Sequence, residues 1–326
     1  MPFDPSAIDA PFRMQPGLRR LAEPGVGVTP SPRDGPVLQA KLAVLSGSAA
    51  QALCAVPGAA VRPALEALMR HAAACRPQAW HWAGPAAPDA PRGGRATAVA
   101  LGWGLDDPFG EASVRAVPGG QEAPHPAAGA CLAALAPAQR LAGLLSLAFV
   151  EDYAVLDARD TTLPWLAVCL PSHWAPEDKL GRPFAEVHAP VADNRLLVGA
   201  AGALARLVAG PQRWERFVWT LTPHGALDGH PRRSPAPAWP AAATGAELLA
   251  LAWLRTEHQS FLPVPAAGLA VFAIEVECRP LAPWLAGDGA SGRGRLRDAL
   301  ASMSPAVLGY RQLDTVQPRL LAAWPA

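Results

Sequence analysis

Apolar residues recur at helical spacing in several segments of the chain. In the segment 61–75, Leu65, Leu68 and Ala72 follow the roughly 3.6-residue period of a helix, which predicts one amphipathic helix. Pro137 marks the boundary between two further predicted helices, because proline ends or kinks a helix. The helices predicted besides 61–75 are at residues 37–46, 127–135, 138–149, 196–208 and 245–259, and from about residue 295 onwards.

Short alternating or apolar runs between these helices predict strands. In the segment 214–221, Arg216 and Val218 alternate with Phe217 and Trp219, as a strand with two different faces requires. This mixed order of helices and short strands favours an α+β fold. The other predicted strands are at residues 96–103, 153–156, 165–170 and 268–277.

The composition indicates a folded protein, and the length suffices for one large domain or two small ones. Hydrophobic residues make up 51% of the 326 residues, so the chain can bury a sizeable core despite its 37 prolines. Residues 1–36 are rich in proline, and we expect them to wrap the surface of a domain that spans residues 37–326.

Charge and cysteine content exclude several classes of protein. The net charge is +1, and no basic excess is clustered as nucleic-acid binding would require. No apolar run reaches the roughly 18 residues of a membrane span, and Met1 to Gly17 lacks the apolar core of a signal peptide. The five cysteines include no close pair and no CxxC motif, which is typical of reduced thiols in the cytoplasm. We therefore expect a cytoplasmic protein with no nucleic-acid or membrane partner.

Common catalytic motifs are missing from the sequence. It contains no GxSxG, P-loop, GxGxxG or HExxH pattern. Their absence disfavours hydrolases with a nucleophile elbow, nucleotide-binding enzymes and zinc proteases.

The densest group of unusual residues lies in the segment 170–194. His188 is flanked there by apolar residues, and Pro190 stiffens the chain that follows it. A neutral imidazole in such surroundings can bind a metal or a haem iron. The pattern alone favours a different interpretation, a buried histidine that is hydrogen-bonded to the backbone.

A second group lies in the segment 254–259. On the predicted helix 245–259, Leu254 and His258 share an apolar face, so Arg255 and Glu257 point elsewhere. Arg255 can hold a carboxylate, such as a haem propionate, by two parallel hydrogen bonds. The pattern alone favours a solvated helix end with a weak surface ion pair.

Four segments together resemble the haem-dependent oxidative N-demethylase alpha-subunit-like family, over residues 12 to about 310. The segment 170–191 is the most specific of them. The segments are Phe12-Arg13-Met14 with Gly17-Leu18, Glu151 to Leu156, Leu170 to Trp174 with Lys179-Leu180-Gly181 and His188 to Val191, and Arg255 to Gln259 with Gly268 to Ile274.

The resemblance implies a fold and a chemistry. It implies a PAS-like antiparallel sheet core with additional helices, in which the segments 165–170, 214–221 and 269–277 are strands of one sheet. It also implies a haem monooxygenase that contains haem b and oxidatively removes a methyl group from a small methylated amine with dioxygen. Electrons would come from a flavin and iron–sulfur reductase subunit.

The resemblance also assigns roles to residues of this chain. His188 becomes the axial ligand of the iron, and Lys179 and Arg255 bind the haem propionates or order the pocket. Glu257 becomes a catalytic residue in a polar relay. These roles are expectations that a structure can locate in space.

Two other interpretations remain open. The first is a non-catalytic PAS-like module that binds haem or another small ligand. It is favoured by the reduced positive charge in and after the segment 255–259. The family usually has basic residues there, where this chain has His258, Leu262 and Pro263. A structural protein without a cofactor requires only that His188 is a packed core residue.

Overall fold

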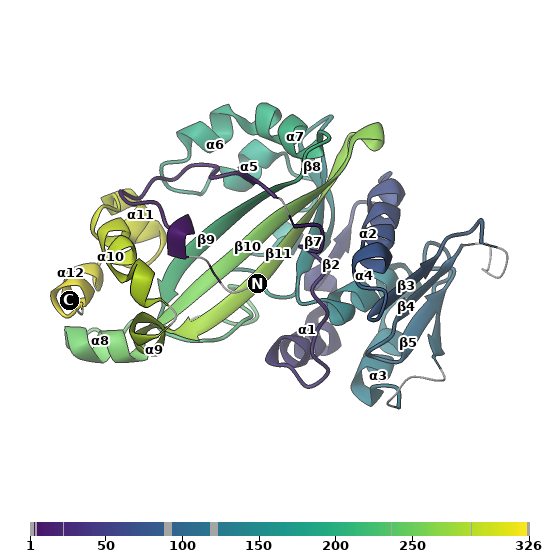
Figure 1. Cartoon of the computed structure of the whole chain (residues 1–326), viewed down its shortest axis with the longest axis horizontal. Helices are drawn as coiled ribbons and strands as arrows, with labels where there is room; N and C mark the ends of the chain where they lie inside the picture. Colours follow the sequence, from purple (N-terminus) through teal and green to yellow (C-terminus); the bar gives the residue numbers. More distant parts are fainter. Residues whose placement is uncertain are drawn as a thin grey trace.

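A seven-stranded antiparallel sheet forms the centre of the chain in the computed structural model (Figure 1), with strand order β1-β9-β10-β11-β7-β8-β2. The structure describes residues 3, 5–21, 23–87, 93–117, 123–235, 237–287 and 289–324. The strands of this sheet are β1 Arg19–Arg20, β2 Leu53–Ala55, β7 Asp152–Asp157, β8 Thr162–Ala167, β9 Trp214–Thr222, β10 Trp253–Val264 and β11 Leu269–Pro280.

The longest pairing in this sheet is the hairpin of β10 and β11. The two strands pair from Trp253 opposite Pro280 to Val264 opposite Leu269. Gly268 closes the turn with φ 65°, a left-handed conformation that glycine adopts without a steric penalty. β9 lies on the other side of β10, so β10 has hydrogen-bonding partners along both of its edges.

The sheet confirms the α+β class and the shared antiparallel sheet that we predicted. The predicted strands 165–170, 214–221 and 269–277 correspond to β8, β9 and β11, all within this one sheet. Alternation identified β9, whose two faces have different surroundings, whereas the continuous apolar run 165–170 overlaps β8 only at residues 165–167.

A smaller four-stranded antiparallel sheet, in the order β3-β4-β5-β6, lies beside α3 and α4. The prediction of one strand at 96–103 was wrong, because a turn at residues 99–102 divides it into β4 and β5. Gly102 in that turn has φ 68°, so the residue that permits the reversal lies inside the predicted strand. The four strands are β3 Trp80–Ala83, β4 Arg95–Ala98, β5 Trp103–Asp106 and β6 Ser113–Ala116.

The predicted helices of the first half of the chain are confirmed. α1 and α2 carry buried apolar faces, and α4 is buried along most of its length within the largest hydrophobic core. Among the described residues no helix is long and apolar enough to cross a membrane. These helices are α1 Pro36–Ala52, α2 Arg62–Cys75, α3 Pro126–Ala134 and α4 Pro137–Ala148.

The helices of the second half are shorter than we predicted. The predicted helix 196–208 is divided at Ala200 into α6 and α7. The predicted C-terminal helix is present as α10. The helices are α5 Phe184–His188, α6 Arg195–Gly199, α7 Ala201–Ala209, α8 Gly245–Leu251, α9 Leu281–Ala286, α10 Arg293–Ala301, α11 Pro305–Tyr310 and α12 Gln317–Ala322.

The predicted helix 245–259 was wrong beyond Leu251. α8 begins at a capping box formed by Thr244 and Glu247 and ends at Leu251, and β10 begins at Trp253. The helical spacing of Leu251, Leu254 and His258 was a coincidence, because tertiary pairing with β9 and β11 overrides local preference. Arg255 and Glu257 therefore lie on a strand, two residues apart and on the same face.

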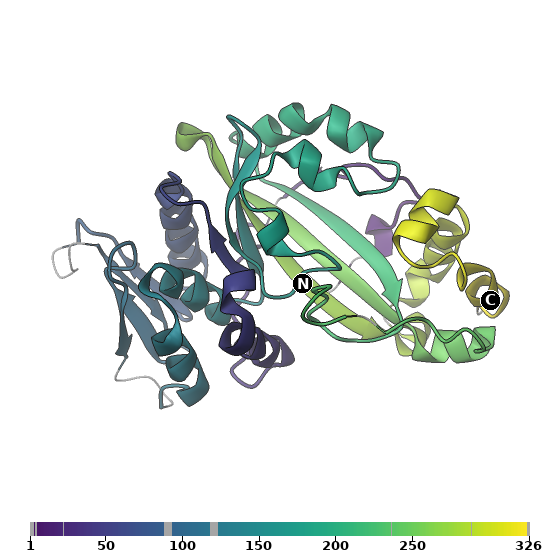
Figure 2. The ribbon, with the colours of Figure 1, turned by 180° about the vertical axis from the view of Figure 1, so that it is seen from behind.

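The two faces of the main sheet are covered by different parts of the chain. We call one the α5–α7 face, because Ala205 and Val208 of α7 pack there against Leu156 of β7. We call the other the N-terminal face, because Phe3 packs there against Phe217. Figure 1 looks onto the N-terminal face and Figure 2 onto the α5–α7 face.

Candidate functional site

His188 is the last residue of α5, and its ring is held by that helix. The ring stacks on Phe184, with 4.0 Å between the centroids, and Nδ1 lies 2.9 Å from the carbonyl oxygen of Phe184. Because a carbonyl can only accept a hydrogen bond, Nδ1 carries the proton and Nε2 keeps its lone pair. The pKa of His188 is lowered to about 4, chiefly by burial and to a smaller extent by the positive charges of Lys179 and Arg216, against the opposing effect of the hydrogen bond to Phe184. The imidazole is therefore neutral near pH 7.

Lys179 lies next to this helix and holds its end. Its Nζ donates a hydrogen bond of 2.9 Å to the carbonyl oxygen of Val187, the residue before His188. The same ammonium lies 5.3 Å from the centre of the Trp174 ring. Burial lowers the pKa of Lys179. Lys179 thus connects the segment after Trp174 to the C-terminus of α5.

Arg255 is 2% exposed and is surrounded by hydrogen-bond acceptors. Its Nε donates to Ser172 Oγ at 2.7 Å. Its terminal nitrogens lie 3.0–3.2 Å from four carbonyl oxygens, those of Leu170, Pro171, Ala226 and Leu227. These uncharged oxygen atoms accept hydrogen bonds from all three nitrogens of the guanidinium group. Arg255 thereby fastens the segment 170–172 and the loop 226–227 to β10.

Glu257 follows Arg255 on the same face of β10. Its carboxylate accepts a hydrogen bond from Gln259 Nε2 at 2.5 Å. Arg216 of β9 is registered directly opposite Gln259, so Glu257 and Arg216 are diagonal neighbours. The guanidinium of Arg311, which follows α11, is close enough to feel the charges of both.

On the α5–α7 face, His188 and Glu257 each lie within electrostatic reach of Arg216, and Lys179 lies within reach of His188. Arg255 contacts residues 170–172, which belong to the family-like segment 170–191, at the same face of the sheet. Sequence reasoning missed Arg216, whose only signal was its alternate position in the strand 214–221. Alternation shows that Arg216 and Phe217 face opposite sides, but it does not show which side carries His188.

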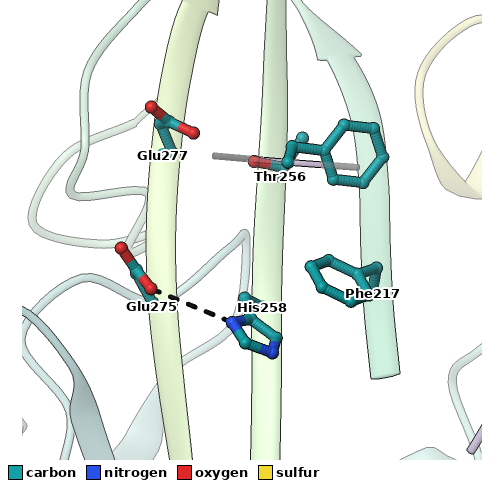
Figure 3. A pocket seen from close by; sticks show the side chains of 6 residues that line it. Phe217, Thr256, His258, Glu275 and Glu277 are labelled. Atoms are coloured by element: carbon teal, nitrogen blue, oxygen red, sulfur yellow. Dashed lines mark ion pairs between the residues drawn. The ribbon is translucent and has the colours of Figure 1, made fainter. Parts of the chain in front are cut away.

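A second cluster of polar groups lies on the N-terminal face, around a pocket of about 10 Å³ (Figure 3). His258 Nε2 lies 2.7 Å from Glu215 Oε2, and its Nδ1 lies 3.9 Å from Glu275 Oε2. The ring stacks on Phe217 at 4.4 Å. This volume suits a single water molecule, so the cluster is a packed polar network and cannot hold a porphyrin.

A larger pocket of about 320 Å³ lies beside the hairpin of β7 and β8. It is lined by the loop 56–61, by Asp157, Arg159 and Asp160, and by Gly181. His188 lines neither of these two pockets.

Residues 131–321 match the sequence model of a family described as haem-dependent oxidative N-demethylase, alpha subunit-like. The chain belongs to this family. The match confirms the resemblance found in the sequence and includes His188, Lys179, Arg216 and Glu257. The family name indicates an oxidative, haem-dependent demethylase and an alpha subunit that works with other subunits. No curated protein matches the chain.

The imidazole of His188 has the orientation that an axial ligand of a haem iron requires. An axial histidine presents one ring nitrogen to the iron, while the other donates to a carbonyl or carboxylate that fixes its orientation. His188 has this arrangement, with Nδ1 held by Phe184 and no described residue hydrogen-bonded to Nε2. In the part of the chain that the structure describes, no three His, Cys, Asp or Glu side chains lie together as ligands for a metal ion. A haem iron requires only one or two ligands from the protein.

Proposed function

We propose that the chain is the haem b-binding subunit of an oxidoreductase that removes a methyl group from a small methylated amine with dioxygen. Family membership supports the class of reaction. The observation that carries the proposal is the state of His188. Its imidazole is neutral and oriented, and Nε2 has no hydrogen-bonding partner among the described residues.

In this proposal Lys179 and Arg255 order the site. Lys179 holds the carbonyl of Val187, so it supports the turn of helix that carries the axial ligand. Arg255 holds the segment 170–172, which leads into Trp174 and Lys179. A ligand needs such support, because a displacement of about 1 Å weakens binding and catalysis.

Glu257 is the proposed catalytic residue. The bound haem would supply the activation of dioxygen. Glu257 lies on the same face of the sheet, and its carboxylate is held in place by Gln259. It can pair with the ammonium form of a small amine and accept its proton, as a polar relay requires.

We also propose the redox partner, the domain arrangement and the cellular location that family membership suggests. The electrons would come from a flavin and iron–sulfur reductase subunit, and the main sheet would be a PAS-like core within a domain of residues 37–326, with residues 1–36 wrapped around it. All five cysteines are free, which supports a reducing, cytoplasmic location.

The test is formaldehyde release from the reconstituted protein. Haem-loaded protein, supplied with a reductase or a chemical electron donor, should release formaldehyde from dimethylamine or trimethylamine in the presence of dioxygen. Glu257→Gln should lower the rate by about 10²–10⁴-fold while the haem spectrum is retained. Glu277→Gln, the same change on the N-terminal face, serves as the matched control. A haem-loaded, reducible protein that oxidises no methylated amine would instead support the non-catalytic binding module.

A further inference from the structure

Arg216 of β9 is partly buried. Its guanidinium makes no hydrogen bond or ion pair with any residue that the structure describes, although burial lowers its pKa. Its neighbours in sequence and in the sheet differ from it in this respect. Arg213 donates to the carbonyl oxygens of Pro24 and Val26, and Arg255 is engaged by Ser172 and four carbonyls.

The nearest carboxylate does not satisfy Arg216. Glu257 lies diagonally across from Arg216, within reach of a long side chain. Glu257 instead accepts from Gln259, and its attraction acts on Arg216 without a direct contact. The acidic and basic groups therefore lie side by side, and no described residue accepts a hydrogen bond from the guanidinium of Arg216.

Positively charged and titratable groups near Arg216 favour the binding of an anion there. Arg216 lies close enough to His188 and Arg311 for its charge to lower the pKa of both. Arg216 is half-buried, so its charge is only partly solvated and repels its positive neighbour Arg311, and a bound anion would relieve that repulsion. A planar guanidinium with five donors suits a carboxylate, which it can bind through two parallel hydrogen bonds.

We propose that Arg216 binds a carboxylate of the ligand that occupies the site at His188. This inference rests on the proposed function. The carboxylate has two possible sources, a propionate of the haem or the carboxylate of an N-methylated amino acid that serves as substrate. In the second case Glu257 would pair with the methylated ammonium while Arg216 holds the opposite end of the same molecule.

The first experiment compares haem with haem dimethyl ester, in which both propionates are blocked. Affinities for the wild type and Arg216→Met are measured by absorbance titration of the haem-free protein. If Arg216 holds a propionate, Arg216→Met weakens haem binding by about 10- to 100-fold and leaves binding of the ester unchanged. Arg206→Met, the same change at an exposed position of α7, should bind both porphyrins as the wild type does.

The second experiment uses haem-loaded protein and measures the binding of N-methylglycine and dimethylamine by calorimetry. If Arg216 holds a substrate carboxylate, Arg216→Met binds N-methylglycine about 10-fold or more weakly than the wild type does. Its affinity for dimethylamine should be unchanged. Arg216→Lys should recover only part of the lost affinity in either experiment, because an ammonium cannot form the two parallel bonds.

The outcomes separate this inference from the function on which it rests. Suppose that the wild type binds haem, and that Arg216→Met changes neither the affinity for haem relative to its dimethyl ester nor the affinity for N-methylglycine relative to dimethylamine. This result overturns the role of Arg216 alone. A wild type that takes up neither haem nor its ester overturns the proposed function and, with it, this inference. Circular dichroism of Arg216→Met should match that of the wild type, since the side chain makes no hydrogen bond within the described protein.

Discussion

The Nε of Arg255 donates a hydrogen bond of 2.7 Å to the hydroxyl oxygen of Ser172. This contact joins β10 to the segment 170–194, although the two residues are 83 positions apart in the sequence. The same guanidinium binds the carbonyl oxygens of two separate loops. The side chain of Arg255 therefore fixes the position of residues 170–172, where the chain leaves the sheet on its way to His188.

Replacement of Arg255 by methionine should destabilise the protein strongly. The carbonyl oxygens at residues 170, 171, 226 and 227 would lose their donor in a buried place. We expect the free energy of unfolding to fall by about 3–5 kcal/mol, measured by urea denaturation. Arg255→Lys should recover only part of this loss, since it has fewer donors in a different geometry. A change below about 1 kcal/mol for Arg255→Met would contradict the anchoring role.

Lys41 forms a buried ion pair with Asp152, the residue at the start of β7. The two side chains are 0% and 2% exposed, and the distance from Nζ to Oδ1 is 3.1 Å. Nζ also donates to the carbonyls of Phe149 and Glu151. Lys41→Met should lower the free energy of unfolding by about 3–5 kcal/mol, because Asp152 would remain as an uncompensated buried charge.

The matched control for Lys41 is Arg62, whose pair with Glu66 lies on the surface of α2. Arg62→Met should change the free energy of unfolding by no more than about 0.5 kcal/mol. The double variant Lys41→Met/Asp152→Asn should be less destabilised than Lys41→Met alone, since it removes the unpaired charge. Equal effects of Lys41→Met and Arg62→Met in urea denaturation would refute the importance of the buried pair.

Glu151 should make stability depend on pH. Burial, with a smaller effect of Glu275, raises its pKa from 4.5 to about 7. Between these values the folded chain keeps a proton that the unfolded chain has released. The free energy of unfolding therefore falls as pH rises from 4.5 to 7, by up to about 1.4 kcal/mol per pH unit. Below this window both states are protonated, and above it both are ionised, so the contribution is constant there.

The measurement is urea denaturation of the wild type and Glu151→Gln across this pH window. Glutamine can still accept the hydrogen bonds from the backbone N–H of Thr29 but cannot ionise. The difference between the two proteins isolates Glu151 from His188, whose lowered pKa acts on stability in the opposite direction. Parallel pH profiles for the two proteins would show that Glu151 titrates normally.

Segments with sustained periodicity were predictable from the sequence. The expected helix 61–75 became α2 at 62–75, and the expected strand 214–221 became β9 at 214–222. In both segments the apolar pattern is long enough to repeat. The tertiary contacts of each segment bury the same face that the pattern marks as apolar. The short strands β3 and β6 were missed, because four residues offer little periodicity and their pairing depends on distant partners.

The arrangement of the site depends on contacts that local patterns do not encode. The segment 253–259 carries helix-like spacing but is drawn into a central strand by β9 and β11. Consequently Arg255 could be recognised as unusual, but its neutral acceptors at residues 170–172 and 226–227 could not. Arg216 gave no distinct signal, because its proposed role depends on β9 lying beside β10 and on the absence of an acceptor for its guanidinium among the described residues.

The most direct measurement for the central claim is the visible absorption spectrum after haem reconstitution. The wild type should show a Soret band of histidine-ligated haem. His188→Ala should lose this band or shift it to a five-coordinate or water-ligated form, while circular dichroism shows a folded protein. His173→Ala and His258→Ala should keep the wild-type spectrum, since His258 lies on the N-terminal face and is held by Glu215. An unchanged Soret band in folded His188→Ala, or no haem uptake by the wild type, would contradict the account.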